Sequence, residues 1–162
     1  MTILLLAGLF LVVIFSFVIL FGAPFLPTLK IRTADALDLL DLKPGQTLLE
    51  LGCGDGRILR AAAERGIHAI GYELNPLLVV WARLRTWRYR RLVRVRLANY
   101  WQVTWPPTDG IYVFLLNPFM KKLDKKLVQY PHKPVRLVSF AFEIPGKKPT
   151  ASQSGMFRYD YR

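Results

Sequence analysis

The stretch that decides the fold reads LLELGCGDG at residues 48–56, and GYELN follows it at residues 71–75. In each stretch an apolar run leads to an acid, Glu50 in the first and Glu73 in the second. This order is typical of a strand, a glycine-rich turn, a helix and a second parallel strand. An acid at the end of the second strand can accept hydrogen bonds from the two hydroxyls of a ribose. The stretch therefore predicts a nucleoside-cofactor site at the carboxyl ends of parallel strands.

The spacing of the glycines narrows the choice of cofactor. A turn that binds a dinucleotide usually reads G-x-G-x-x-G and rests a pyrophosphate on the helix N-terminus. Here the turn reads G-x-G-x-G, with Asp55 between its second and third glycines. An acid repels phosphate but suits a ligand that carries an ammonium and a sulfonium, as S-adenosylmethionine does. Glu50 could orient that ammonium directly or through water.

We therefore predict that S-adenosylmethionine binds to this turn and to the acids beside it. The predicted cofactor-binding residues of this region are Glu50, Gly52, Cys53, Gly54, Asp55, Gly56, Glu73 and Leu74. The alternative is a plain strand-to-helix turn that needs glycine only for its positive φ angles. Three glycines and three acids in this short region favour the cofactor site.

Predicted strands and helices alternate along the chain, which implies a mostly parallel sheet with right-handed crossovers. Strands are predicted at residues 47–51, 67–72, 93–97, 111–115, 135–142 and 156–161, the last one antiparallel. Helices are predicted at residues 34–42, 57–65, 76–90 and 121–130, and Thr33 is predicted to cap the first. The buried stripe of the third helix is predicted to consist of Leu77, Trp81, Leu84 and, as a further candidate, Trp87.

The loop after the third predicted strand carries a polar residue and two aromatic ones. In this architecture the loop commonly meets the adenine ring of the cofactor. Asn99 could hydrogen bond to the edge of the base, and Tyr100 or Trp101 could stack on its face. We therefore predict that Asn99 and Tyr100 bind the cofactor. Packing of these side chains without a ligand is the alternative interpretation.

The fourth predicted strand leads to Asn117, Pro118 and Phe119, toward which the methyl group of the cofactor should point. We predict these three as the catalytic residues, because methyl transfer needs an aligned donor and acceptor rather than a covalent nucleophile. Asn117 could orient a lysine amine that arrives neutral after desolvation. A helix cap, Asn followed by Pro, is the alternative, and the two interpretations are compatible.

Cysteine and histidine usage excludes several other kinds of site. The single cysteine, Cys53, rules out an intramolecular disulfide and a cysteine-rich metal site, and we predict that it fills space in the turn. His68 and His132 lack the spacing of metal ligands, so no metal site is predicted. The chain also has no phosphate-binding P-loop, zinc-protease motif or serine nucleophile elbow.

An apolar segment precedes the predicted domain. Residues 3–22 carry no charge, and about 20 such residues span the hydrocarbon core of a bilayer as a helix. No basic residue precedes the run, which disfavours a cleaved signal peptide, whereas Lys30 and Arg32 follow it. We predict a membrane location, with a single-pass transmembrane anchor at residues 1–23 and the rest of the chain in the cytoplasm. A buried helix of a soluble protein is the alternative.

The formal net charge is +12, and basic residues gather in two groups. The groups are Arg83, Arg85, Arg88, Arg90, Arg91, Arg94 and Arg96, and then Lys121, Lys122, Lys125 and Lys126. Such clusters bind anionic surfaces. For a tethered domain the nearest one is the anionic membrane surface, and nucleic acid is the competing partner. A solvated helix face would account for some of these arginines without any partner.

Three segments together resemble one family: residues 24–28, the turn at 50–56 with Arg57 and Ile58, and GYELNP at 71–76. The family is that of the small seven-β-strand protein-lysine methyltransferases. It is related to the mitochondrial enzymes that act on the c-subunit of ATP synthase and on the adenine nucleotide translocase. The similarity covers roughly residues 24–145.

The resemblance implies a fold, an activity and part of a site. The fold is α/β, a Rossmann-like seven-β-strand (class I) methyltransferase domain at residues 24–162. This chain departs from the family at its C-terminus, which is short, so we expect one strand of the usual antiparallel pair to be missing. The activity is transfer of a methyl group from S-adenosylmethionine to a lysine ε-amine of a protein, often a membrane protein. The resemblance also implies that Thr28 lines the cofactor pocket with Glu50, Gly52 and Glu73.

Three hypotheses about function remain open. The first is a membrane-tethered protein-lysine methyltransferase. The second is a nucleic-acid or small-molecule N-methyltransferase, because residues 117–119 are similar to the Asn-Pro-Pro-Tyr motif of methyltransferases that act on bases. The third is a membrane-surface module that keeps the fold but has no enzymatic activity and does not bind S-adenosylmethionine.

Overall fold

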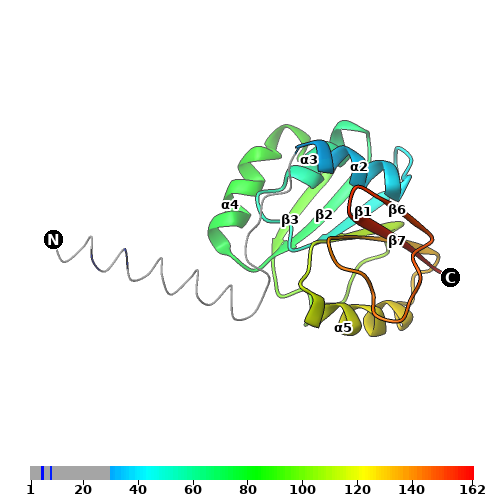
Figure 1. Cartoon of the computed structure of the whole chain (residues 1–162). Helices are drawn as coiled ribbons and strands as arrows, with labels where there is room; N and C mark the ends of the chain where they lie inside the picture. Colours follow the sequence, from blue (N-terminus) through cyan, green and yellow to red (C-terminus); the bar gives the residue numbers. More distant parts are fainter. Residues whose placement is uncertain (1–4, 6–7, 9–29) are drawn as a thin grey trace.

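The structure is a computed structural model that describes Leu5, Gly8 and residues 30–162. The described chain forms one seven-stranded sheet with helices on both faces (Figure 1). The predicted transmembrane anchor at residues 1–23 lies outside the described residues, apart from Leu5 and Gly8. Among the described residues, no helix combines the length and the apolar character that crossing a membrane requires.

The sheet has the strand order β3-β2-β1-β4-β5-β7-β6. Its parallel strands are β1 (Thr47–Leu51), β2 (His68–Glu73), β3 (Val93–Leu97), β4 (Gly110–Val113) and β5 (Val135–Phe140). Antiparallel pairing adds β7 (Met156–Tyr161) to β5 and β6 (Ala151–Gln153) to β7. The predicted seven-strand fold is confirmed, but the expectation of a missing strand is wrong. Both C-terminal strands are present, and β6 is short with three residues.

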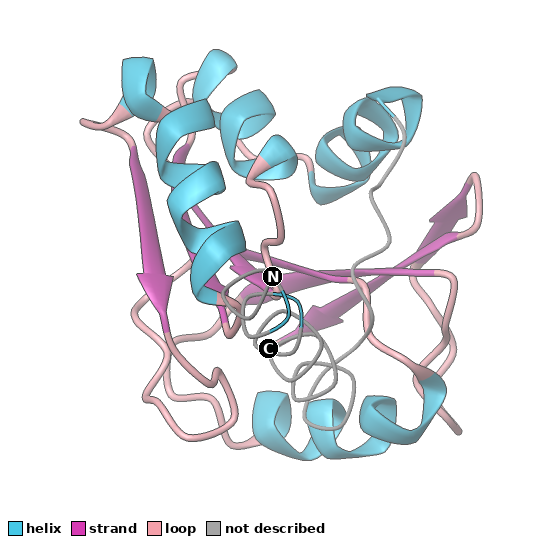
Figure 2. Cartoon of the chain, turned by 90° about the vertical axis from the view of Figure 1, so that its left-hand side faces the viewer, coloured by secondary structure: helices cyan, strands magenta, loops and turns pink. Residues whose placement is uncertain are grey.

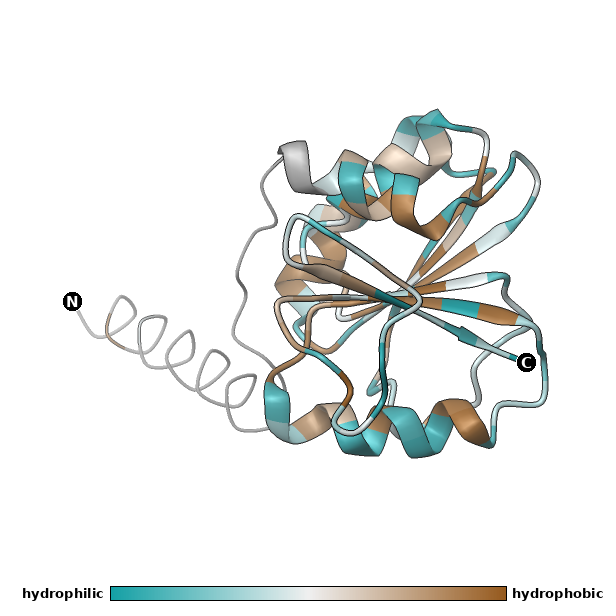
Figure 3. Ribbon diagram, turned by 45° about the vertical axis from the view of Figure 1, so that its right-hand side comes forward, coloured by the Kyte–Doolittle hydropathy of each residue, from teal (hydrophilic) through white to brown (hydrophobic). Residues whose placement is uncertain are grey.

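Helices cover the two faces of the sheet unequally (Figures 2 and 3). One face carries α2 (Lys30–Leu40), α3 (Arg57–Glu64) and α4 (Pro76–Arg85), and the other carries α5 (Asn117–Val128). A short 3₁₀ helix, η1 (Trp87–Tyr89), follows α4. The prediction that Thr33 caps the first helix is wrong, because α2 begins at Lys30 and Thr33 lies inside it.

Two apolar cores form because successive strand side chains point to opposite faces. In β1, Leu48 packs with the side chains of α2 and α3, whereas Leu49 and Leu51 pack on the α5 side. Glu50 lies on the same face as Leu48, one step before the strand ends. The position of β1 between β2 and β4 makes it the point where the strand order reverses, and ligands of open α/β sheets bind at such a point.

The predicted buried stripe of α4 is wrong. Its members Leu77, Trp81 and Leu84 are exposed, and so is Trp87 beyond the helix end. The buried face consists instead of Val79 and Ala82. α4 packs closely against the turn at this point, since a Cβ built on Gly56 would lie only 3.0 Å from the Ala82 Cβ.

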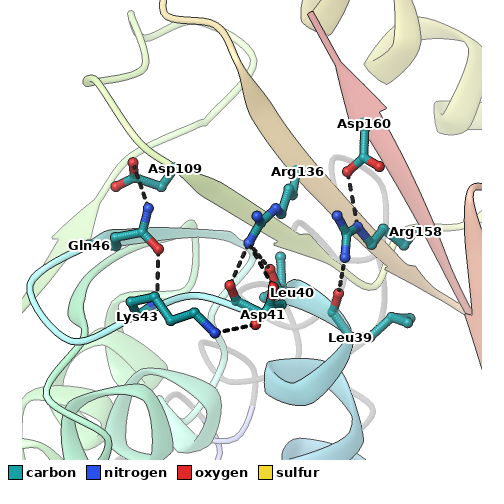
Figure 4. A network of polar contacts seen from close by, with 9 residues as sticks. All are labelled: Leu39, Leu40, Asp41, Lys43, Gln46, Asp109, Arg136, Arg158 and Asp160. Carbon is teal, nitrogen blue, oxygen red and sulfur yellow. Dashed lines mark hydrogen bonds and ion pairs between the residues drawn. The ribbon is translucent and has the colours of Figure 1, made fainter.

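A polar network at the amino-terminal ends of the strands fastens α2 to the sheet (Figure 4). The guanidinium of Arg136 in β5 donates to the carbonyl oxygens of Leu40, at 3.0 Å, and Asp41. Arg158 in β7 donates to the Leu39 carbonyl at 3.3 Å. These bonds hold the end of α2 at the edge of the sheet opposite to the glycine-rich turn.

Candidate functional site

The glycine-rich turn leaves β1 in a conformation that keeps the space above it open. The backbone N–H groups of Gly52 and Cys53 both donate to the Tyr72 carbonyl at 2.9 Å, which fixes the turn against β2. Gly52 has a φ of 83°, and a Cβ built on it would meet no atom within 4 Å. Glycine is therefore needed here for its backbone angle, and the room above it is available to a ligand.

Glu73 is fixed at the carboxyl end of β2 by three backbone N–H groups. One carboxylate oxygen, Oε2, accepts from the Gly54 N–H at 2.9 Å. The other, Oε1, accepts from the N–H groups of Leu74 and Asn75, each at 2.9 Å. A carboxylate offers about four lone-pair positions, so it can still accept from a ligand hydroxyl. This buried, preorganised acid fits the predicted contact with a ribose.

Glu50 is the buried acid whose bonding is incomplete. Its Oε2 atom has no hydrogen-bond partner within the described part of the chain. Burial raises its pKa well above the ordinary value, and repulsion from Asp55 and Glu73 raises it further. A cationic group such as an amino-acid ammonium would supply the missing partner and favour the ionised carboxylate. The residues present therefore fit the amino-acid end of S-adenosylmethionine.

Asp55 has partners inside the protein. Its carboxylate accepts from Arg57 Nε at 3.0 Å and Nη2 at 2.7 Å, and it pairs with Arg85 Nη1 at 2.9 Å. Burial raises the pKa of Asp55, but the two guanidinium groups outweigh it and hold the pKa below the usual value. Its negative charge is thus balanced by arginines, and its side chain ties the turn to α3 and α4. Glu50 and Glu73 are the acids left for a ligand.

Cys53 faces the apolar core of the α3 side. It is 3% exposed, and burial raises the pKa of its thiol well above the ordinary value. A Cβ on Gly71 would lie 2.6 Å from the Cys53 sulfur and 2.5 Å from Leu59 Cδ1. A protonated, packed thiol is a poor nucleophile, which agrees with the predicted space-filling role. Its backbone remains part of the turn.

The loop after β3 is held by a lysine that sequence reasoning missed. Lys126 of α5 donates to the carbonyl oxygens of Tyr100, Trp101 and Val103 at 3.1, 3.1 and 3.2 Å. Burial, and then repulsion from Lys122, lowers the pKa of Lys126. The sequence placed this residue in a surface cluster, and no local signal distinguishes it from Lys125.

The two predicted adenine-binding residues lie at the start of this loop and differ in exposure. Asn99 is half-buried, and its Oδ1 accepts from the Trp101 N–H at 3.0 Å, which leaves its amide N–H groups available. Tyr100 is buried, and its ring lies 4.9 Å from that of Trp101. The half-buried Trp101 is accordingly the more accessible ring for stacking on a base.

The three predicted catalytic residues open α5 at the carboxyl end of β4. Leu116 occupies the N-cap position, so the interpretation of Asn117 as a helix cap is wrong. Asn117 and Pro118 are exposed, and Asn117 makes no side-chain hydrogen bond with the described residues. Phe119 is half-buried, and its ring centroid lies 6.2 Å from that of Trp101. The start of α5 and the loop after β3 therefore meet through aromatic contacts, and the Asn117 amide can reach a substrate.

One predicted cofactor contact has no structural description. Thr28, which the family resemblance assigns to the pocket, lies outside the described residues. Its role stays a prediction.

Comparison with known proteins agrees with this arrangement. A family model of the ANTKMT methyltransferase domain matches residues 50–151. The ATP synthase C-subunit lysine N-methyltransferase of Homo sapiens is 33% identical over 128 residues, which cover 78% of this chain and 54% of that protein. The adenine nucleotide translocase lysine N-methyltransferase of Mus musculus is 37% identical over 123 residues, 74% of this chain and 53% of that protein. The chain thus spans about half the length of these two curated relatives.

A solved structure gives the match in three dimensions. An RNA methyltransferase from Salinibacter ruber, in complex with S-adenosyl-L-homocysteine, superposes with a TM-score of 0.77 at 27% identity. The match covers 83% of this chain and 93% of that one. Sequence, strand order and superposition lead to one assignment: this chain belongs to the family of the ANTKMT methyltransferase domain.

Proposed function

We propose that this protein transfers a methyl group from S-adenosylmethionine to a lysine ε-amine of a protein substrate. The observation that carries the proposal is the pair of buried acids, Glu50 and Glu73, beside the open turn at Gly52. The names of the two lysine methyltransferases to which the chain is similar support the choice of acceptor.

The residues divide the binding of the cofactor between them. Glu50 would pair with the ammonium of its amino-acid end, and Glu73 would accept from its ribose hydroxyls. Asn99 and Trp101 would hold the base. When bound, the cofactor supplies an electrophilic methyl carbon on a positive sulfur. These contacts act by positioning, which lowers the barrier because donor and acceptor are already aligned when they are bound.

The acceptor amine would approach from the start of α5. Transfer would join the amine lone pair to the methyl carbon that the cofactor supplies, with loss of the C–S bond, and the proton of the methylated amine would go to water. The amine must arrive neutral, and desolvation beside Phe119 and Trp101 lowers its pKa in the required direction. Asn117 would accept a hydrogen bond from the amine through Oδ1 and so align the lone pair.

Transfer to lysine can be tested with labelled cofactor. The full-length protein is incubated with S-adenosylmethionine that carries a deuterated methyl group, together with membranes and with RNA, and the labelled product is located by mass spectrometry. The proposal predicts deuterated methyl groups on lysine peptides, lost with Glu73→Ala and kept with Glu64→Gln, an exposed acid away from the pocket. Label found in RNA alone would contradict it.

A second candidate is methylation of a nucleic acid. It is favoured by the superposition on the RNA methyltransferase and by the basic surface. This function predicts binding to RNA that weakens steeply with salt, because arginines that contact phosphates release counterions. It also predicts that the label of the same experiment appears on bases.

We also propose that residues 1–23 anchor the protein in a membrane with the methyltransferase domain in the cytoplasm. The uncharged run at residues 3–22 and the basic Lys30 and Arg32 after it support this. Alkaline carbonate washing of membranes from expressing cells tests the anchor, and release of the protein by the wash would contradict it.

A further inference from the structure

The outward face of α4 is apolar although it is exposed. Leu77, Val80, Trp81, Leu84 and Trp87 are between 48% and 64% exposed. Their spacing of three and four residues places the first four on one side of the helix, and Trp87 continues the row into η1. We call this row the α4 stripe. Soluble monomers rarely expose large contiguous apolar patches, and such patches mark surfaces that bind a partner.

The chain segment that carries the α4 stripe is basic and contains no acid. Residues 76–108 include seven arginines and no aspartate or glutamate. Four of these arginines are exposed on α4, on η1 and in the turn after η1: Arg83, Arg88, Arg90 and Arg91. The Arg90 guanidinium lies 5.2 Å from the ring centroid of Trp87, so basic and aromatic groups share one surface. The partner must therefore be both anionic and able to accept apolar side chains.

We infer that the α4 stripe docks in the interfacial layer of an anionic lipid bilayer. Tryptophan prefers that layer, leucine and valine reach the acyl boundary, and arginines bind the headgroup phosphates. Nucleic acid would satisfy the arginines but would leave Val80 and Leu84 in water. A bilayer of neutral lipids would accept the apolar side chains but would leave these four arginines without counter-charges. An anionic bilayer meets both requirements.

Docking would place the predicted cofactor site beside the lipid headgroups. The stripe begins at Leu77, whose N–H donates to the N-cap oxygen of Asn75 at 2.9 Å, just after Glu73. It therefore starts at the carboxyl edge of the sheet. If the proposed function holds, lysines at a membrane surface become the accessible acceptors. The docking itself does not depend on methyl transfer.

A label on the stripe tests this inference in the full-length protein. Leu84→Cys can be labelled selectively with an environment-sensitive fluorophore, because the native Cys53 is only 3% exposed. The matched control is Gln153→Cys on β6, an exposed residue at the opposite edge of the sheet. Both proteins are reconstituted into vesicles of phosphatidylcholine, with or without phosphatidylglycerol, whose acyl chains carry bromine to quench the fluorophore. Circular dichroism verifies that each variant is folded.

The inference predicts quenching at position 84 in vesicles with phosphatidylglycerol, much less in phosphatidylcholine alone, and none at position 153. Arg88→Gln should lower the ratio of docked to undocked molecules about fivefold. Each arginine near an anionic bilayer strengthens membrane binding by about this factor. Three results would overturn the inference. They are an unquenched label at position 84 in anionic vesicles, equal quenching in neutral vesicles, and a label shielded from water before lipid is added.

Discussion

Glu50 is the residue at which stability and ligand binding oppose each other. Its buried carboxylate lacks a partner for Oε2 and lies near two other acids. The folded protein therefore holds a proton on Glu50 more tightly than the unfolded chain does. Stability contributed by this group is complete below the ordinary glutamate pKa of 4.5 and is lost as the pH rises from there toward the raised folded value. A cationic ligand beside Glu50 favours the ionised carboxylate and so removes the cost of ionising this group at neutral pH.

Glu50→Gln should consequently stabilise the ligand-free protein at neutral pH while weakening cofactor binding. Hydrogen bonds to charged groups contribute about 1.5–3 kcal/mol, so affinity should fall roughly 10- to 100-fold. Urea unfolding at pH 5 and pH 8 measures the change in the free energy of unfolding, and the stabilisation by Glu50→Gln should be larger at pH 8. Calorimetry measures the loss of cofactor affinity. A variant that is less stable at pH 8, or that binds as tightly as the wild type, would refute this account of Glu50.

Gly71 is required by a close approach rather than by its backbone angles. Its missing Cβ leaves room for the Cys53 sulfur and for Leu59. Gly71→Ala should lower the free energy of unfolding by about 1–3 kcal/mol, as overpacking of a core does. Cys53→Ala in the same chain removes the nearest sulfur and should restore part of the loss. Denaturant unfolding of the wild type, the two single variants and the double variant measures the coupling between the two positions. Strictly additive changes in the free energy of unfolding would show that the two side chains do not touch.

At the scale of elements, the sequence predicts what an element is better than which face it buries. The bounds of β1 and β3 were predicted correctly, because apolar runs between turn residues define them. α4 carries two apolar rows, and the larger row at Leu77, Trp81 and Leu84 was assigned to the core. The row of smaller side chains, Val79 and Ala82, is the buried one, because α4 packs closely against the turn at Gly56 through Ala82. Periodicity alone contains no information about that approach.

The contact between α5 and the loop after β3 gives the next prediction. Lys126→Met keeps the apolar stem but removes the ammonium that binds three loop carbonyls. The loop should loosen and the affinity for the adenosine part should fall, with about 1–3 kcal/mol lost from the loop. Lys125→Met, an exposed neighbour, is the control and should change nothing. Hydrogen exchange of residues 99–105 measures the loop, and equal protection in both variants would contradict the assigned role.

For the whole molecule, the carboxyl ends and the amino ends of the parallel strands have separate roles. These two ends of the sheet are called its carboxyl edge and its amino edge. The carboxyl edge carries Glu50, Glu73 and the start of α5, whereas the amino edge carries the network around Arg136 (Figure 4). Arg136→Gln should therefore lower the free energy of unfolding by about 1–2 kcal/mol and leave cofactor affinity unchanged. Arg91→Gln, at an exposed position, should change neither the free energy of unfolding nor the cofactor affinity. Calorimetric binding and urea unfolding of the same samples separate the effects, and a loss of affinity with Arg136→Gln would show that the edges are coupled.

The candidate site could be predicted from the sequence as far as it depends on strand ends. Glu50 and Glu73 each follow a buried run, so their arrival at one edge follows from a parallel sheet. The pairing of Asp55 with Arg57 and Arg85 could not be predicted, because Arg85 lies on a different helix and its orientation depends on how α4 packs. The anchoring by Lys126 depends likewise on a tertiary contact.

The central claim is that Glu50 and Glu73 form a pocket for S-adenosylmethionine, and titration calorimetry with the full-length protein tests it most directly. The account predicts saturable, one-to-one binding of S-adenosylmethionine and of S-adenosylhomocysteine. Binding should be lost with Glu73→Ala and unchanged with Glu64→Gln. Absence of heat for the wild-type protein, or equal affinity in Glu73→Ala, would contradict the account.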